Sequence, residues 1–152
     1  MKIFKLISII STLFCLLICL FVIDPFFGVR YTVSESLPYK FFISRPCSHV
    51  VKNQYVAFEH PKSPVLVAKQ VIGMAGDYIS MQGDHLCINE QDYGHILEIS
   101  QSGMHLHPTA EGQIPEGYVF VYGPHPESFD SRYQEFGLVK TEQLKETLWP
   151  LF

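Results

Sequence analysis

The sequence predicts a mainly β domain that follows one N-terminal transmembrane helix and ends in a short C-terminal helix. Three observations support this prediction: an uncharged apolar run near the N-terminus, short strand-like segments over most of the chain, and one segment of helical spacing near its end. The chain has 152 residues, a length typical of one domain.

The apolar run occupies residues 6–23 and contains no charged side chain. As a helix it is roughly 27 Å long, close to the thickness of the hydrocarbon layer of a bilayer. Lys2 and Lys5 precede it. The positive-inside rule therefore places residues 1–5 in the cytoplasm and residues 24–152 in an extracytoplasmic domain.

Two other interpretations of the run are open. A cleavable signal peptide usually ends in a small-x-small site, but this run ends in Phe21, Val22 and Ile23. A buried helix of a soluble fold is disfavoured because the run has no polar face. An uncleaved anchor is the interpretation that the pattern favours.

The predicted strands are short, rich in β-branched and aromatic residues, and separated by Gly, Pro, Asn and Asp. They cover residues 55–60, 65–73, 77–83, 85–91 and 117–123. Residues 94–114 fit no regular pattern, and we expect a surface excursion there. Residues 141–149 predict a short helix, because Thr141 can cap it and Leu144 and Leu148 would share one face.

Composition excludes several classes of function. The net charge of −4 gives no basic surface for a nucleic acid. The four cysteines form no C-x-x-C pair, and His105 and His107 have no third ligand at a recognisable spacing, so no metal or other cofactor is expected. Cys47 and Cys87 could pair as a disulfide if the domain lies in an oxidising compartment.

Serine and lysine are the strongest candidates for chemistry. Lys69 lies in an apolar, strand-like segment, and burial would lower its pKa because a buried ammonium group is poorly solvated. A pKa lowered from ~10.4 to roughly 7.4 would leave about half of the amine neutral near pH 7.4. A neutral lysine can take the proton of a serine hydroxyl. The segment Ser-Glu-Ser-Leu-Pro at residues 34–38 supplies two such hydroxyls.

The order of the motifs resembles that of the type I signal peptidase family of membrane-anchored serine-lysine proteases. The apolar run precedes Ser-Glu-Ser-Leu-Pro (34–38), Ala-Lys-Gln-Val-Ile-Gly-Met-Ala-Gly-Asp (68–77) and Ser-Phe-Asp-Ser-Arg (128–132). The resemblance covers nearly the whole chain beyond residue 30. The Ser-Leu-Pro form and the short domain are closer to the TraF-type peptidases that mature pilin subunits for conjugal transfer.

The resemblance implies a signal-peptidase-like β domain, and it assigns a role to individual residues. Ser36 would be the nucleophile and Lys69 the general base. Ser34 would join the backbone N–H of Ser36 in the oxyanion hole. For Ser34 the alternative is a plain turn hydroxyl.

The late motif would support this dyad. By the resemblance, Ser128 would hydrogen-bond the catalytic lysine, and Asp130 and Arg132 would form a supporting ion pair. The alternative for that pair is a surface ion pair worth under ~1 kcal/mol. The chain departs from the family pattern at three places: Gly-Pro-His replaces Gly-Asp-Asn at residues 123–125, Ala75 replaces a proline, and Lys40 stands where conjugation peptidases often have glycine.

The resulting prediction is a serine endopeptidase that removes the leader from an exported pre-pilin. We expect the bacterial inner membrane as its location, with the N-terminus cytoplasmic and the catalytic domain periplasmic. Its expected partners are an exported pre-pilin or other preprotein, membrane lipid, and a conjugation or type IV secretion apparatus, with no nucleic acid. The alternatives are a non-catalytic, membrane-anchored assembly factor of such an apparatus and a general signal peptidase.

Overall fold

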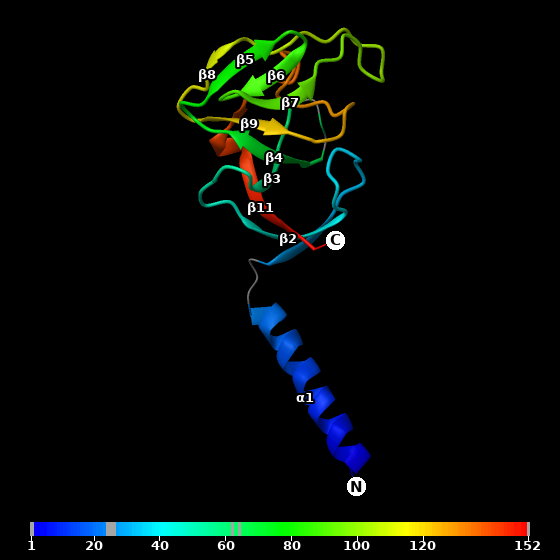
Figure 1. Ribbon diagram of the computed structural model, residues 1–152. Coiled ribbons are helices and arrows are strands. Elements are labelled where there is room, and N and C mark those ends of the chain that lie inside the picture. The colour runs from blue at the N-terminus through cyan, green and yellow to red at the C-terminus, as the bar shows by residue number, and fades with distance from the viewer. Residues whose placement is uncertain (1, 24–26, 62, 64, 152) are drawn as a thin grey trace.

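The computed structural model describes residues 2–23, 27–61, 63 and 65–151. Helix α1 (Lys2–Ile23) covers the predicted apolar run, and Figure 1 shows it as a single rod. Among the described residues, no helix combines the length and the apolar character needed to cross a bilayer. The transmembrane span predicted over residues 6–23 is therefore not shown, and the side chains of residues 19–23 lie outside the described part.

The rest of the chain is built on a larger sheet of seven strands in the order β1-β2-β11-β3-β4-β9-β10. Neighbouring strands in this sheet are antiparallel throughout. The strands are β1 (Gly28–Tyr31), β2 (Phe41–Pro46), β3 (Tyr55–Phe58), β4 (Val67–Gly73), β9 (Tyr118–Tyr122), β10 (Val139–Lys140) and β11 (Leu144–Pro150). Strand β11 is inserted between β2 and β3, so both ends of the domain meet in one sheet (Figure 1).

A smaller sheet of four strands has the order β7-β6-β5-β8. Its strands are β5 (Tyr78–Gln82), β6 (His85–Ile88), β7 (Gln91–His95) and β8 (Gly112–Gln113). In Figure 1 this sheet lies beyond β9 and β4, at the end of the domain opposite β2. Ile72 of β4 and Phe120 of β9 share a buried cluster with Ile79, Leu86 and Ile88 of the smaller sheet, which joins the two sheets.

The five strands that the sequence predicts are all present as β3, β4, β5, β6 and β9, with slightly shorter ends. The surface excursion predicted over residues 94–114 is largely irregular, although Leu106 and Ile114 in it are buried. Cys47 packs against the larger sheet and Cys87 is buried in β6. Both cysteines are free, so the disulfide that the sequence left open is not formed.

The C-terminal helix predicted over residues 141–149 is wrong. Only the short 3-10 turn η1 (Thr141–Gln143) is helical, and the chain then enters strand β11. Leu144 and Leu148 suggested one helical face because they are four residues apart. In the sheet a bulge in β11 shifts the register, and the two leucines pack on opposite faces. Pairing with strands on both sides therefore overrides the local pattern.

The two faces of the larger sheet carry different clusters. The Val71 cluster comprises Val56, Phe58, Val71, Val119, Val121, Val139 and Leu144. The Phe42 cluster comprises Leu37, Phe42, Ala57 and Leu148. Adjacent residues of one strand point to opposite faces, so Ala68 of β4 packs on the Phe42 cluster while Val67 packs on the Val71 cluster. Lys69 shares the face of Val67.

Candidate active site

Lys69 is a buried lysine whose side chain is 3% exposed. It lies opposite Val56 of β3, on the face of the Val71 cluster. Burial lowers the pKa of Lys69 from 10.5 to about 8, while the charge of Asp130 opposes this change and that of Arg132 assists it. About a quarter of the side chain is then neutral at pH 7.5, against about one part in a thousand for an ordinary lysine.

The Lys69 amine has one polar partner in the interior. Lys69 Nζ donates a hydrogen bond of 2.6 Å to Ser128 Oγ. Ser128 is itself 4% exposed, and it lies in the loop that follows β9. A buried amine without a hydrogen-bond partner would be costly, so this contact fixes where the amine lies.

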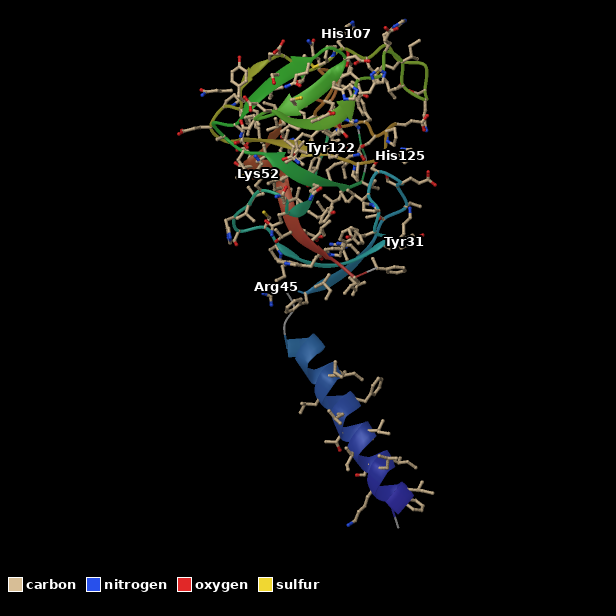
Figure 2. The ribbon with its side chains drawn as sticks, viewed as in Figure 1. Tyr31, Arg45, Lys52, His107, Tyr122 and His125 are labelled. Atoms are coloured by element: carbon tan, nitrogen blue, oxygen red, sulfur yellow. The ribbon has the colours of Figure 1, made fainter. Side chains whose placement is uncertain are left out.

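Asp130 and Arg132 form a buried ion pair, so the surface ion pair considered as an alternative is wrong. Arg132 donates from Nε to Asp130 Oδ1 over 2.9 Å and from Nη2 to Oδ2 over 3.0 Å. Arg132 Nη2 also donates to the carbonyl oxygen of Ser128 over 3.1 Å. The guanidinium carbon lies 4.9 Å from the ring centroid of Tyr122, which Figure 2 labels near the middle of the domain. The pair therefore holds the loop that carries Ser128.

Gly123 lies between the Ser128 loop and the segment that carries Ser36. Its N–H donates to Asp130 Oδ2 over 2.9 Å. A Cβ atom at this position would lie 2.3 Å from Ser128 Oγ and 2.7 Å from the carbonyl oxygen of Ser36. Only glycine allows this close approach, and the approach brings the Ser36 segment against the partner of the buried lysine.

Ser34 and Ser36 are hydrogen-bonded to each other. The Ser36 N–H donates to Ser34 Oγ over 3.1 Å, and the Ser34 hydroxyl donates to Ser36 Oγ over 2.8 Å. Lys40 Nζ donates to the carbonyl oxygen of Ser34 over 3.2 Å, and Leu37 is buried at 3% exposure in the Phe42 cluster. These contacts form a turn that presents both hydroxyls. Among the described residues, no hydrogen bond joins Ser36 to Lys69.

Ser34, Ser36 and Lys69 line one pocket of about 580 Å³. Two segments contribute most of its lining: residues 31–34, 36 and 37, which include the Tyr31 labelled in Figure 2, and residues 63 and 65–69. His60, Phe129 and Phe136 also line the pocket.

Strand β4 has a free edge at this pocket. Strand β3 pairs with β4 from Val67 onward, whereas β9 pairs with it only from Gln70 onward. Within the described part of the chain, the β9 side of residues 65–69 therefore has no strand partner. An unpaired edge of this kind offers backbone N–H and C=O groups to an extended peptide.

The structure brings the sequence-derived candidates together at one place. Ser34, Ser36 and Lys69 line the pocket, and Ser128 binds Lys69 from the protein interior. The sequence analysis missed the packing role of Gly123, although this residue ends the predicted strand 117–123. It also missed the three rings beside the pocket, because only the fold brings them near Lys69.

The described residues contain no group of three or more His, Cys, Asp or Glu side chains arranged to hold a metal ion. His107, considered with His105 as a ligand pair, donates a hydrogen bond of 2.6 Å from Nδ1 to the Glu135 carboxylate instead. Figure 2 shows His107 at the end of the domain far from Tyr31.

The chain is similar to known proteins in two comparisons. The family model described as signal peptidase, peptidase S26, matches residues 1–148. Among solved structures, the crystal structure of a signal peptidase I from Enterococcus faecalis V583 is 27% identical, over 64% of this chain and 94% of that chain, with a TM-score of 0.43. No curated protein is significantly similar to the chain. The family match spans nearly the whole sequence, so the chain belongs to the signal peptidase family, peptidase S26, and is a serine peptidase.

Proposed function

We propose that this serine peptidase removes leader peptides from exported proteins with Ser36 as its nucleophile and Lys69 as its general base. The observation that supports these roles best is the buried Lys69 amine beside the pocket that Ser36 lines. Its pKa of about 8 keeps a useful fraction of the amine neutral near neutral pH. Ser128 holds the amine in place.

The reaction begins when the Ser36 hydroxyl turns from Ser34 toward Lys69. Neutral Lys69 takes the hydroxyl proton as Ser36 Oγ attacks the carbonyl carbon of the scissile bond. The protonated amine then gives this proton to the leaving nitrogen, and the leader remains attached to Ser36 as an ester. Water, activated by the same amine, hydrolyses the ester and frees Ser36.

The oxyanion of this reaction needs hydrogen-bond donors at about 2.7–3.1 Å. The Ser34 hydroxyl donates to Ser36 Oγ and the Ser36 N–H donates to Ser34 Oγ, so both donors lie beside the nucleophile. A substrate carbonyl that enters between them would take over both hydrogen bonds. Lys40 holds the backbone of Ser34 while this exchange takes place.

The substrate would bind as an added strand along the free edge of residues 65–69. Such a strand hydrogen-bonds through its main chain, so it is recognised mainly by the side chains that fit the pocket. Ala68 and Leu37 form the apolar lining on the Phe42 side. We propose that they accept a small side chain, such as alanine, immediately before the cut.

The test is a processing assay with purified full chain and a preprotein that carries a leader. Ser36→Ala and Lys69→Ala should each abolish the appearance of the mature product, because each removes an atom that reacts. Ser48→Ala and Lys145→Ala, which change exposed residues away from the pocket, serve as matched controls and should process normally. Normal processing by Lys69→Ala would overturn the mechanism, and normal processing by both site variants would favour the non-catalytic assembly factor.

We further propose that the natural substrate is a pre-pilin of a conjugative transfer system, with contacts to the secretion apparatus. This proposal rests on the Ser36-Leu37-Pro38 sequence and the short domain, which are closer to the TraF-type peptidases than to general signal peptidases. Incubation with a pre-pilin and with several unrelated preproteins would separate the two. Equal processing of all of them would favour a general signal peptidase.

We propose the bacterial inner membrane as the location of the chain, with the domain of residues 24–152 in the periplasm. It is supported by the uncharged sequence of residues 6–23 and by Lys2 and Lys5 before it. Alkaline extraction should leave the chain in the membrane fraction, and protease added to spheroplasts should digest the domain. Protection of the domain in intact spheroplasts would contradict this orientation.

A further inference from the structure

The pocket has two chemically different halves, on opposite sides of β4. Ala68 and Leu37 lie on the Phe42 side and are small or aliphatic. On the Lys69 side lie three rings that we call the aromatic wall: His60, Phe129 and Phe136. A strand bound along the edge of β4 would therefore meet a different surface on each of its faces.

The aromatic wall is an organised group rather than three separate side chains. The His60 ring stacks on the Phe136 ring with centroids 4.2 Å apart and planes 14° apart. The Phe129 ring meets Phe136 edge-on at 5.3 Å. Phe136 packs on the Val71 cluster, which fixes the wall on the face from which Lys69 projects. His60 is 9% exposed, so the packing of the wall is tight.

One residue of the aromatic wall is adjacent in the chain to the hydrogen-bond partner of Lys69. Phe129 directly follows Ser128, whose hydroxyl accepts the hydrogen bond from Lys69. Lys69 is the one lysine, arginine or carboxylate among the described residues that line the pocket. A substrate side chain that reaches this half therefore meets rings and a partly neutral amine, and no carboxylate.

The alternation of side chains along a strand indicates which substrate residue reaches the wall. Residues 31–34 and 65–68 of the lining lead up to Ser36 and Lys69 in the chain, and we place the leader half of the substrate along them. The leader half stays bound to Ser36 as the ester, and binding in this part of the pocket would hold it through both steps. If the residue before the cut faces Ala68, the second residue before the cut faces the wall.

We propose that the aromatic wall is a specificity subsite for the second residue before the cut, where it prefers an aromatic or large aliphatic side chain. This inference rests on the proposed function of Ser36 and Lys69. A large apolar side chain gains contact with the rings and leaves water. A carboxylate at the same place would lie near Lys69, favour its protonated form and reduce the neutral fraction that acts as base.

The experiment compares leader peptides that differ only at the second residue before the cut, with phenylalanine, leucine, alanine or aspartate there. For the unaltered full chain, kcat/KM should be about tenfold higher with phenylalanine than with alanine, and lowest with aspartate. Phe136→Ala should reduce the preference for phenylalanine to less than about twofold. Its kcat/KM should fall less on the alanine peptide than on the phenylalanine peptide, because the alanine peptide gains little from the wall.

Several controls keep the outcomes separate. His60→Ala and the milder Phe136→Leu should weaken the same preference in case Phe136→Ala fails to fold. Tyr78→Ala removes an exposed aromatic residue of the smaller sheet and should leave the preference unchanged. An equal loss on all peptides would make Phe136 merely structural and overturn the inference. An unchanged preference for phenylalanine in both Phe136→Ala and His60→Ala would also overturn the inference. A preference at the residue after the cut, and none at the second residue before it, would do the same.

Failure of the proposed function would look different. In that case the unaltered chain would cleave none of the peptides, or cleavage would persist in Ser36→Ala. A chain that cleaves all four peptides at equal rates through Ser36 retains the proposed function and refutes the aromatic wall as a subsite.

Discussion

Lys69 Nζ lies 2.6 Å from Ser128 Oγ, and both side chains are almost wholly excluded from solvent. The two residues come from different parts of the chain, one from β4 and the other from the loop after β9. The contact gives a buried amine a neutral partner rather than a carboxylate. A carboxylate would have kept Lys69 protonated, whereas a hydroxyl allows its pKa to fall.

The first prediction concerns the pH dependence of activity. In the proposed mechanism only neutral Lys69 can accept the Ser36 proton, and burial lowers the pKa of Lys69 to about 8. The kcat/KM for a leader peptide should rise with pH through an apparent pKa near 8 and level off above it. A pH–rate profile of the unaltered chain measures this. A midpoint near the ordinary ~10.4 of lysine would contradict the assignment of Lys69 as base.

The second prediction concerns stability. The pKa of Lys69 is lower in the folded than in the unfolded chain, so the unfolded chain binds more protons between about pH 8 and 10.5. Stability should therefore rise with pH across this window and be lowest below it. Lys69→Met removes the buried amine and should be more stable than the unaltered chain by about 1–3 kcal/mol at pH 7.

Urea unfolding of both proteins at pH 7 and at pH 10 tests the second prediction. The advantage of Lys69→Met should shrink at pH 10, because Lys69 is then mostly neutral in the folded chain and the unfolded chain has begun to lose the same proton. A variant that is less stable than the unaltered chain at pH 7 would show that the lysine contributes packing or ion pairing that outweighs its burial.

The third prediction concerns Ser128 as a positioning residue. Ser128→Ala removes the acceptor of the Lys69 hydrogen bond, so the amine loses its fixed position and kcat should fall by about 100-fold. The charged amine loses more than the neutral amine, so the apparent pKa should move below about 8. A pH–rate profile of this variant checks both effects. A fall in activity without any movement of the pH profile would mean that Ser128 acts only through the fold.

The fourth prediction concerns the Asp130–Arg132 pair, whose side chains are 0% and 2% exposed. Asp130→Ala leaves the Arg132 guanidinium buried without its partner and should destabilise the domain by about 3–5 kcal/mol. Lys52→Ala breaks an exposed ion pair with Asp77 and should cost less than about 1 kcal/mol. Denaturant unfolding of both variants makes the comparison. Equal losses would mean that burial does not decide the strength of the pair.

The sequence predicts some parts of this molecule well for a definite reason. Five strands follow from alternation and β-branched residues, because their side chains pack locally on one face. Among the strands that it misses, β1, β7, β8 and β10 lie at a sheet edge or are very short, whereas β2 lies inside the larger sheet. Strand β11 was mispredicted for another reason. Leu144 and Leu148 have a spacing that fits a helix, and only pairing with β2 and β3 makes this segment a strand.

The candidate site also has residues that the sequence predicts and residues that it does not. Ser36, Lys69 and Ser128 belong to short motifs, so their types and order suggest chemistry before any fold is known. Burial of Lys69 also follows from its apolar strand. The aromatic wall could not be predicted from the sequence, because His60 and Phe136 lie 76 positions apart and meet only through the fold. Contacts of this range leave no local pattern in one sequence.

The last prediction concerns Gly123, where the sequence analysis saw only the end of a strand. In Gly123→Ala the new Cβ would meet Ser128 Oγ at 2.3 Å and the Ser36 carbonyl oxygen at 2.7 Å, so one of the two segments must move. We expect a destabilisation of about 1–3 kcal/mol together with a large loss of kcat. Thermal unfolding and leader-peptide cleavage measure the two effects. Because a shift of about 1 Å in a reacting group can cost about 100-fold in rate, the loss of activity should exceed what the small loss of folded protein explains. Full activity in Gly123→Ala would mean that the approach of the two segments at this glycine is not needed for catalysis.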